Sequence, residues 1–100
     1  MNFDRLSKKL GLEVDEYLEL YALFVETCTA DLKLLQSAID ASDMAEIARI
    51  VHSLKGAALN LGLDEFFELV TTIEKTTGDG KLNETAETVR IFQAVLNKSV

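Results

Sequence analysis

The sequence predicts an all-α fold, an antiparallel four-helix bundle preceded by a short lead-in helix. The chain of 100 residues has no proline and five glycines, most of them placed where a helix would end. Between these glycines the apolar residues recur at helical spacing and do not alternate, so no strand is expected. Four helices with one apolar stripe each and short connections pack most simply around a common core. We therefore expect residues 1–100 to form a single domain.

The first two helices are predicted from their apolar spacing. A short amphipathic helix places Phe3, Leu6 and Leu10 on one side and ends at Gly11. In the long helix that follows, apolar or weakly polar residues repeat at alternating intervals of four and three. Its predicted packed seam comprises Val14, Leu18, Tyr21, Val25, Cys28, Leu32, Leu35 and Ile39. Because Cys28 lies within this seam, we interpret it as a small core residue and not as a reactive thiol.

Three further helices are expected after this seam. Ser42 and Asp43 interrupt it, and Asp43 followed by Glu46 has the spacing of a capping box that starts the next helix. The predicted bounds are from this box to about Gly62, from Asp64 to about Thr77, and from the 81–84 region nearly to the end of the chain, with residues 78–80 as the last loop.

Charge and composition exclude several classes of function. Ten Lys and Arg against 17 Asp and Glu give a formal net charge of −7, and this sign opposes binding to DNA or RNA. A single cysteine excludes an intramolecular disulfide and a cysteine-built zinc site. The amino terminus lacks the apolar run of a secretion signal, and no stretch reaches the roughly 18 apolar residues of a membrane span. We therefore expect a cytoplasmic protein with no nucleic-acid or membrane partner.

The helix after Asp43 carries the only histidine of the chain. Its core stripe, which falls within a sector roughly 80° wide, comprises Ile47, Val51, Leu54, Ala58 and Leu61. His52 points about 140° away from the middle of this stripe when successive residues are spaced by about 100°. The imidazole should therefore project towards water.

The neighbours of His52 on the same outer face are small, basic or apolar. Ala48, Arg49, Lys55 and Gly56 lie three or four residues away, with Ala45 and Leu59 one further turn out. Glycine within an exposed helix costs about 1 kcal/mol relative to alanine, so clearance beside His52 is a reason for Gly56. Lys55 can place positive charge near an anion bound there.

The sequence allows four interpretations of His52. An exposed histidine near basic residues is most often ordinary solvated surface. A metal site lacks a second histidine, and Glu46, Glu65 and Glu68 do not have ligand-like spacing with His52. A hydrolytic triad fails because the adjacent Ser53 points about 100° away. A lone nucleophile fits, because an exposed imidazole near neutral pH has a ring nitrogen with a free lone pair for a phosphoryl group.

The segment from His52 to Gly62, His-Ser-Leu-Lys-Gly-Ala-Ala-Leu-Asn-Leu-Gly, resembles the signature of the histidine-containing phosphotransfer (HPt) domain family. The resemblance implies that His52 is the phosphorylated residue, that Lys55 assists electrostatically, and that Gly56 opens the surface to a partner. It also places Arg49, Asn60 and Gly62 at positions where the family often has similar residues. Glu74 lies where some members have a glutamine or glutamate that orients the histidine. Leu59 departs from the smaller residue usual in the family.

The resemblance further implies a relay protein and not a kinase. The chain would take a phosphoryl group from the aspartyl phosphate of a response-regulator receiver domain, for example that of a hybrid histidine kinase, and pass it to another receiver. Magnesium would be held by the receiver, and the chain itself would bind no metal or cofactor. One exposed face serving successive partners favours a monomer.

Two alternatives remain open from the sequence. The same bundle could be a substrate domain phosphorylated directly by a histidine kinase. It could instead be a docking module that binds receivers without being phosphorylated, through a patch formed by Ala45, Ala48, Leu59 and Leu63.

Overall fold

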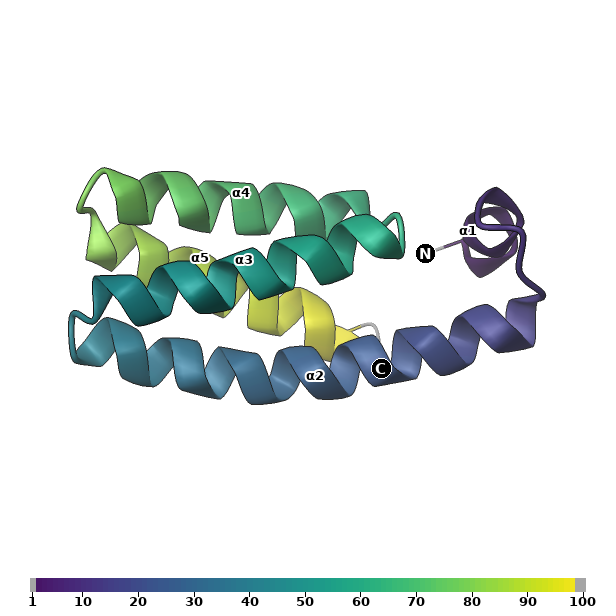
Figure 1. Ribbon diagram of the computed structural model, residues 1–100, viewed down its shortest axis with the longest axis horizontal. Helices are drawn as coiled ribbons and strands as arrows, with labels where there is room; N and C mark the ends of the chain where they lie inside the picture. The colour runs from purple at the N-terminus through teal and green to yellow at the C-terminus, as the bar shows by residue number, and fades with distance from the viewer. Residues whose placement is uncertain (1, 99–100) are drawn as a thin grey trace.

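The structure, a computed structural model, describes residues 2–98, and over this range it consists of helices joined by short turns, with no strand (Figure 1). Its five helices are α1 (Phe3–Lys9), α2 (Val14–Asp40), α3 (Met44–Asn60), α4 (Asp64–Gly78) and α5 (Leu82–Lys98). The all-α prediction is confirmed, and every predicted helix is present close to its expected position. In this part of the chain no helix has the length and apolar character needed to cross a membrane.

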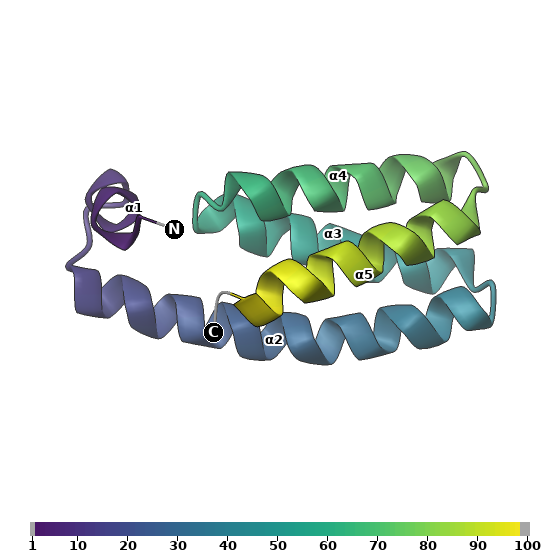
Figure 2. The same ribbon diagram turned by 180° about the vertical axis from the view of Figure 1, so that it is seen from behind.

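Helices α2 to α5 form an elongated bundle, and the chain as a whole, with α1, measures 41 × 20 × 20 Å. Helix α2 packs against α3 and α5, and α4 packs against the same two helices, whereas α3 and α5 do not pack together. Figures 1 and 2 show α3 and α5 on opposite faces of the layer made by α2 and α4. Short helix α1 contacts the start of α2 and lies beyond the ends of the other helices (Figure 1). One whole face of α3 therefore remains open to solvent.

The turns on either side of α3 are fixed locally. The Asp43 side chain accepts a hydrogen bond of 3.1 Å from the backbone N–H of Glu46, which satisfies a free donor at the helix start. The reciprocal half of the expected capping box is not formed, because the Glu46 carboxylate accepts hydrogen bonds from Arg49. Gly62 ends the helix with φ of 67°, a left-handed conformation that glycine adopts at low cost.

The core confirms most of the predicted seam of α2 but corrects its first turns. Tyr21, Cys28, Leu32, Leu35 and Ile39 are buried, and Val14 and Val25 are half-buried. Leu18 is instead 42% exposed, and Tyr17 and Phe24 occupy the core in this region. A seven-residue repeat drifts by about 20° per heptad around a straight helix, so a seam extended over several turns leaves the buried face.

Leu10 is a second correction. It was expected on the buried side of the lead-in helix with Phe3 and Leu6, but it is 42% exposed. Helix α1 ends at Lys9, so Leu10 lies at its C-cap and no longer follows the helical stripe. Leu6 is buried and Phe3 is half-buried, as predicted.

A buried hydrogen bond fixes the end of α3 to α2. The hydroxyl of Tyr17 donates to the backbone carbonyl of Leu61 at 2.7 Å, 44 residues away in the sequence. The rings of Phe24, Phe66 and Phe92 then connect α2, α4 and α5, with centroid separations of 5.3 and 5.0 Å. The open face of α3 is thus supported from beneath by a packed core.

Candidate functional site

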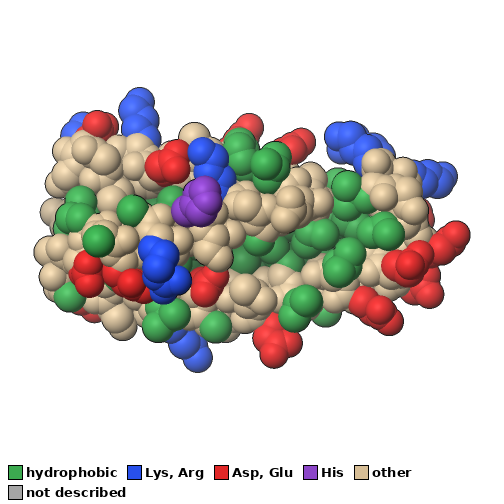
Figure 3. Space-filling model, in the orientation of Figure 1, with side chains coloured by type: hydrophobic (Ala, Val, Ile, Leu, Met, Phe, Trp, Pro, Cys, Tyr) green, Lys and Arg blue, Asp and Glu red, His purple; other side chains and the backbone are tan. Residues whose placement is uncertain are grey.

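The buried face of α3 determines where His52 points. All five residues of the predicted stripe are buried, and so is Ile50, which the stripe omitted. His52 lies on the opposite face and is exposed (Figure 3). Among residues 2–98, no side chain forms a hydrogen bond or ion pair with the imidazole. A ring nitrogen of His52 is therefore accessible to a reactant that approaches from solvent.

Lys55 lies one turn after His52 and is held by contacts from α4. Its Nζ donates to Oε1 of Glu74 at 3.1 Å and lies 5.8 Å from the centroid of the Phe67 ring. The Lys55 side chain remains 34% exposed and that of Glu74 49% exposed. The ammonium group is therefore held by two residues of α4, one helical turn after His52, and can still reach solvent.

This geometry corrects the expected role of Glu74. The resemblance places at this position a residue that orients the histidine, but the Glu74 carboxylate accepts a hydrogen bond from Lys55 and makes none with His52. Phe67, which was not among the residues predicted for the site, also contacts Lys55 through its ring. Neither partner could be found from spacing along α3, because both belong to α4.

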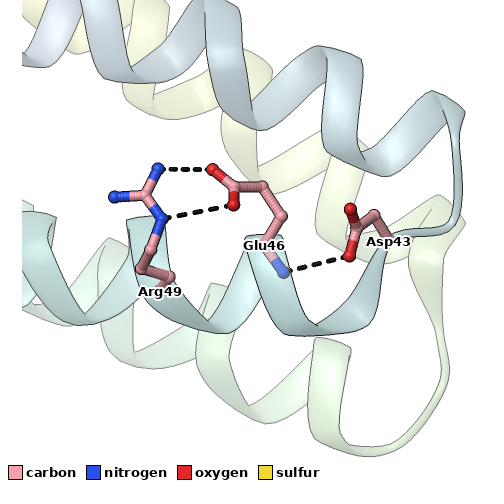
Figure 4. A network of polar contacts seen from close by, with 3 residues as sticks. All are labelled: Asp43, Glu46 and Arg49. Atoms are coloured by element: carbon pink, nitrogen blue, oxygen red, sulfur yellow. Dashed lines mark hydrogen bonds and ion pairs between the residues drawn. The ribbon is translucent and has the colours of Figure 1, made fainter.

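Arg49 lies one turn before His52 and is paired within its own helix. Its Nε donates to Oε2 of Glu46 at 3.2 Å, and its Nη2 makes a second contact with Oε1 of the same carboxylate (Figure 4). The hydrogen bonds from Arg49 lower the pKa of Glu46, and those to Glu46 raise the pKa of Arg49. A spacing of three residues on one helix permits this pair, so the sequence contained the signal for it.

Besides Glu46, the carboxylate of Asp31 on the neighbouring helix α2 also acts on Arg49. Partial burial raises the pKa of Asp31 on α2, and the positive charge of Arg49 opposes this effect. The negative charges of Glu46 on α3 and Asp31 on α2 thus both raise the pKa of Arg49.

Apart from Arg49 and Lys55, the exposed residues around His52 on α3 are small or apolar. Ala45, Ala48 and Gly56 are exposed, and Leu59 is 64% exposed. A Cβ atom at Gly56 would meet nothing within 4 Å, so packing within the described chain does not require a glycine there. The open space beside His52 is consistent with the predicted clearance.

Leu63 does not belong to this surface, contrary to the docking patch drawn from the sequence. Its side chain is only 3% exposed and packs in the core at the start of α4. The prediction extended the outer face of α3 past its last residue, Asn60. The left-handed turn at Gly62 redirects the chain there, so helical angles no longer apply.

Other candidate chemistry is absent from this region. Within residues 2–98, no cluster of three His, Cys, Asp or Glu side chains could hold a metal ion. Cys28 is fully buried, and burial, with a smaller contribution from Asp31, raises the pKa of its thiol to about 12. Its predicted role as a core residue is confirmed.

The bundle presents an unpaired histidine between two basic side chains. This arrangement defines a class of helical proteins in which an imidazole can act as a nucleophile towards a macromolecular partner. The Hpt domain family model matches residues 19–99, and the chain belongs to this family. Its members are phosphotransfer carriers in phosphorelay signalling, not kinases, and interact with response-regulator receiver domains. Comparisons with curated proteins and with solved structures gave no match.

Proposed function

We propose that this chain is a phosphotransfer protein of a multistep phosphorelay. His52 accepts a phosphoryl group from the aspartyl phosphate of one receiver domain and passes it to another. The observation that carries this proposal is the exposed, unpaired imidazole of His52 with Lys55 one turn away. The match to the Hpt family supports it independently.

The proposed chemistry needs one free ring nitrogen. That nitrogen of the neutral imidazole attacks phosphorus, so a P–N bond forms while the P–O bond to the receiver aspartate breaks. The aspartate leaves as a carboxylate with the bonding electrons, and the proton on the other ring nitrogen can pass to solvent. Lys55 would stabilise charge on the transferring group, and alignment of the two side chains in the complex would supply much of the rate.

The partner would supply the remaining components. Magnesium is expected on the receiver domain, and no cofactor is assigned to this chain. Ala45, Ala48, Arg49, Gly56 and Leu59 would contact the receiver, because they surround His52 on the exposed face of α3. We further propose that α2 to α5 are arranged as an antiparallel four-helix bundle. The protein would act as a cytoplasmic monomer whose single exposed face serves successive partners.

The proposal is tested by phosphoryl transfer from a panel of phosphorylated receiver domains to the wild-type chain and to His52→Gln. We expect acid-labile, alkali-stable label on the wild type alone, with equal helical content in both proteins by circular dichroism. Label on both would overturn the assignment of His52. Binding without label on either would favour a docking module. A parallel incubation with a histidine kinase and ATP tests the other alternative, because label from the kinase and from no receiver would favour a kinase substrate domain.

A further inference from the structure

His52 lies midway between two basic residues of α3, and each of them is paired with a carboxylate. Lys55 follows His52 by three residues and is bound by Glu74. Arg49 precedes His52 by three residues and is bound by Glu46. A phosphoryl group on His52 would therefore arrive next to two cations that already have acidic partners.

The two cations are held in different ways. Lys55 is fixed by a residue of another helix and also lies over the Phe67 ring. Arg49 and Glu46 form a more open pair, with side chains that are 63% and 37% exposed. Exposed pairs of this kind contribute little to stability and can exchange partners at low cost. Arg49 is thus the more readily released of the two cations.

Arg49 can reach either of two anions without backbone movement. Glu46 is three residues before it and His52 three residues after it, and Cβ atoms at this spacing are about 5–6 Å apart. A histidine phosphoryl group would carry more negative charge than one carboxylate, with three acceptor oxygens. The planar guanidinium can donate to two of these oxygens at once, as it does to Glu46.

We propose that phosphorylation of His52 draws Arg49 from Glu46 to the phosphoryl group, and that Glu46 regulates the charge state of the phosphohistidine by competing for Arg49. Asp31 on α2 adds a second negative charge that acts on Arg49. This inference rests on the proposed phosphorylation of His52. Arg49 and Glu46 act in it as positioning residues.

The test uses phosphoramidate as a donor that needs no receiver domain. The P–N bond of phosphoramidate breaks as the P–N bond to His52 forms, and ammonia leaves. The second ionisation of the phosphohistidine is then followed by ³¹P NMR as a function of pH. Wild type is compared with Glu46→Gln, Arg49→Gln and the double variant. The control is Glu87→Gln, which removes one exposed carboxylate from α5, a helix that does not pack against α3.

We expect Glu46→Gln to raise the second ionisation constant about two- to fivefold, the range of an exposed ion pair. Arg49→Gln should lower it by a similar factor, and the double variant should match Arg49→Gln. Glu87→Gln should match the wild type. If Glu46→Gln behaves like Glu87→Gln, or if the double variant keeps the gain of Glu46→Gln, competition through Arg49 is overturned.

The inference and the relay proposal can fail separately. Equal ionisation constants in a chain that exchanges phosphoryl groups with receivers would overturn only the role of Glu46. The expected ionisation pattern in a chain that takes no phosphoryl group from any receiver would support the exchange at Arg49 and overturn the relay. No phosphohistidine from phosphoramidate or receivers would overturn both.

Discussion

The imidazole of His52 makes no hydrogen bond with residues 2–98, whereas the side chains of both basic residues beside it do. A phosphoryl group at this position would therefore meet cations whose geometry is already set by Glu46 and Glu74. The histidine was located from helical periodicity, because burial of one face of α3 fixes the direction of the other. The Lys55–Glu74 pair could not be located in this way, since its members are 19 residues apart and meet only when α3 packs against α4.

Replacing Lys55 by Gln should slow phosphoryl transfer to His52 by about tenfold, because a hydrogen bond from a charged donor to the transferring group is lost. Transfer from a phosphorylated receiver, followed by rapid quenching, measures this rate. Lys33→Gln on α2 removes the same charge from an exposed site and serves as the control. An unchanged rate in Lys55→Gln would show that Lys55 does not contact the reacting group.

Cys28 should make stability fall at alkaline pH. Its thiol pKa is raised from 9.0 to about 12 by burial, with a smaller effect of Asp31. Between these values the unfolded chain has lost the thiol proton and the folded chain has kept it, so the free energy of unfolding falls by about 1.4 kcal/mol per pH unit.

Urea unfolding of wild type and Cys28→Ala as a function of pH measures this contribution. Below about pH 8 the difference in stability between the two proteins should be constant, because the thiol is protonated in both states. Above pH 9 the wild type should lose stability more steeply than the variant. Parallel curves throughout would contradict the raised pKa.

Helix α3 combines a buried stripe for stability with an open face for chemistry, and its ends are set by Asp43 and Gly62. The sequence predicted both ends to within a few residues. It failed just beyond them, at Leu63, because the direction of a side chain can be calculated only while the chain remains helical. It also failed on α2, where Tyr17 displaced Leu18 from the core through the cumulative drift of a long helix.

Gly56→Ala should separate the stability of α3 from its function. A Cβ at this position meets nothing within 4 Å, and alanine favours a helix over glycine by about 1 kcal/mol. The variant should therefore unfold at higher urea concentration while its transfer rate falls severalfold, because the methyl group narrows the approach to His52.

Gly78→Ala at the end of α4 is the matched control, since a Cβ there also meets nothing within 4 Å. It should leave transfer unchanged. If Gly56→Ala transfers at the wild-type rate, clearance beside His52 is not the reason for this glycine.

Figure 3 shows the histidine on one face of the elongated molecule, and in the same orientation α5 lies behind that face (Figure 1). The helical spacing, caps and loop lengths in the sequence predicted the helices and the outward direction of His52, but they did not predict on which side of the bundle α5 lies. What the sequence could not supply was the contact between helices, such as the hydrogen bond from Tyr17 to Leu61 and the proximity of Asp31 to Arg49.

Partner binding should depend on the face of α3 and not on exposed apolar residues in general. Leu59 is 64% exposed on α3, and Ile91 is 48% exposed on α5. Leu59→Ala should weaken binding of a receiver domain about tenfold, within the range for loss of an interface side chain. Ile91→Ala should leave the affinity unchanged by titration calorimetry. Equal effects of both substitutions would place the interface elsewhere.

The central claim is that His52 both accepts and returns a phosphoryl group. The most direct measurement starts from purified chain labelled at His52, adds an unphosphorylated receiver domain with magnesium, and follows the label over time. The account predicts that label leaves His52 and appears on the receiver as acid-stable, alkali-labile aspartyl phosphate. Label that stays on His52 while the receiver binds normally would contradict the relay.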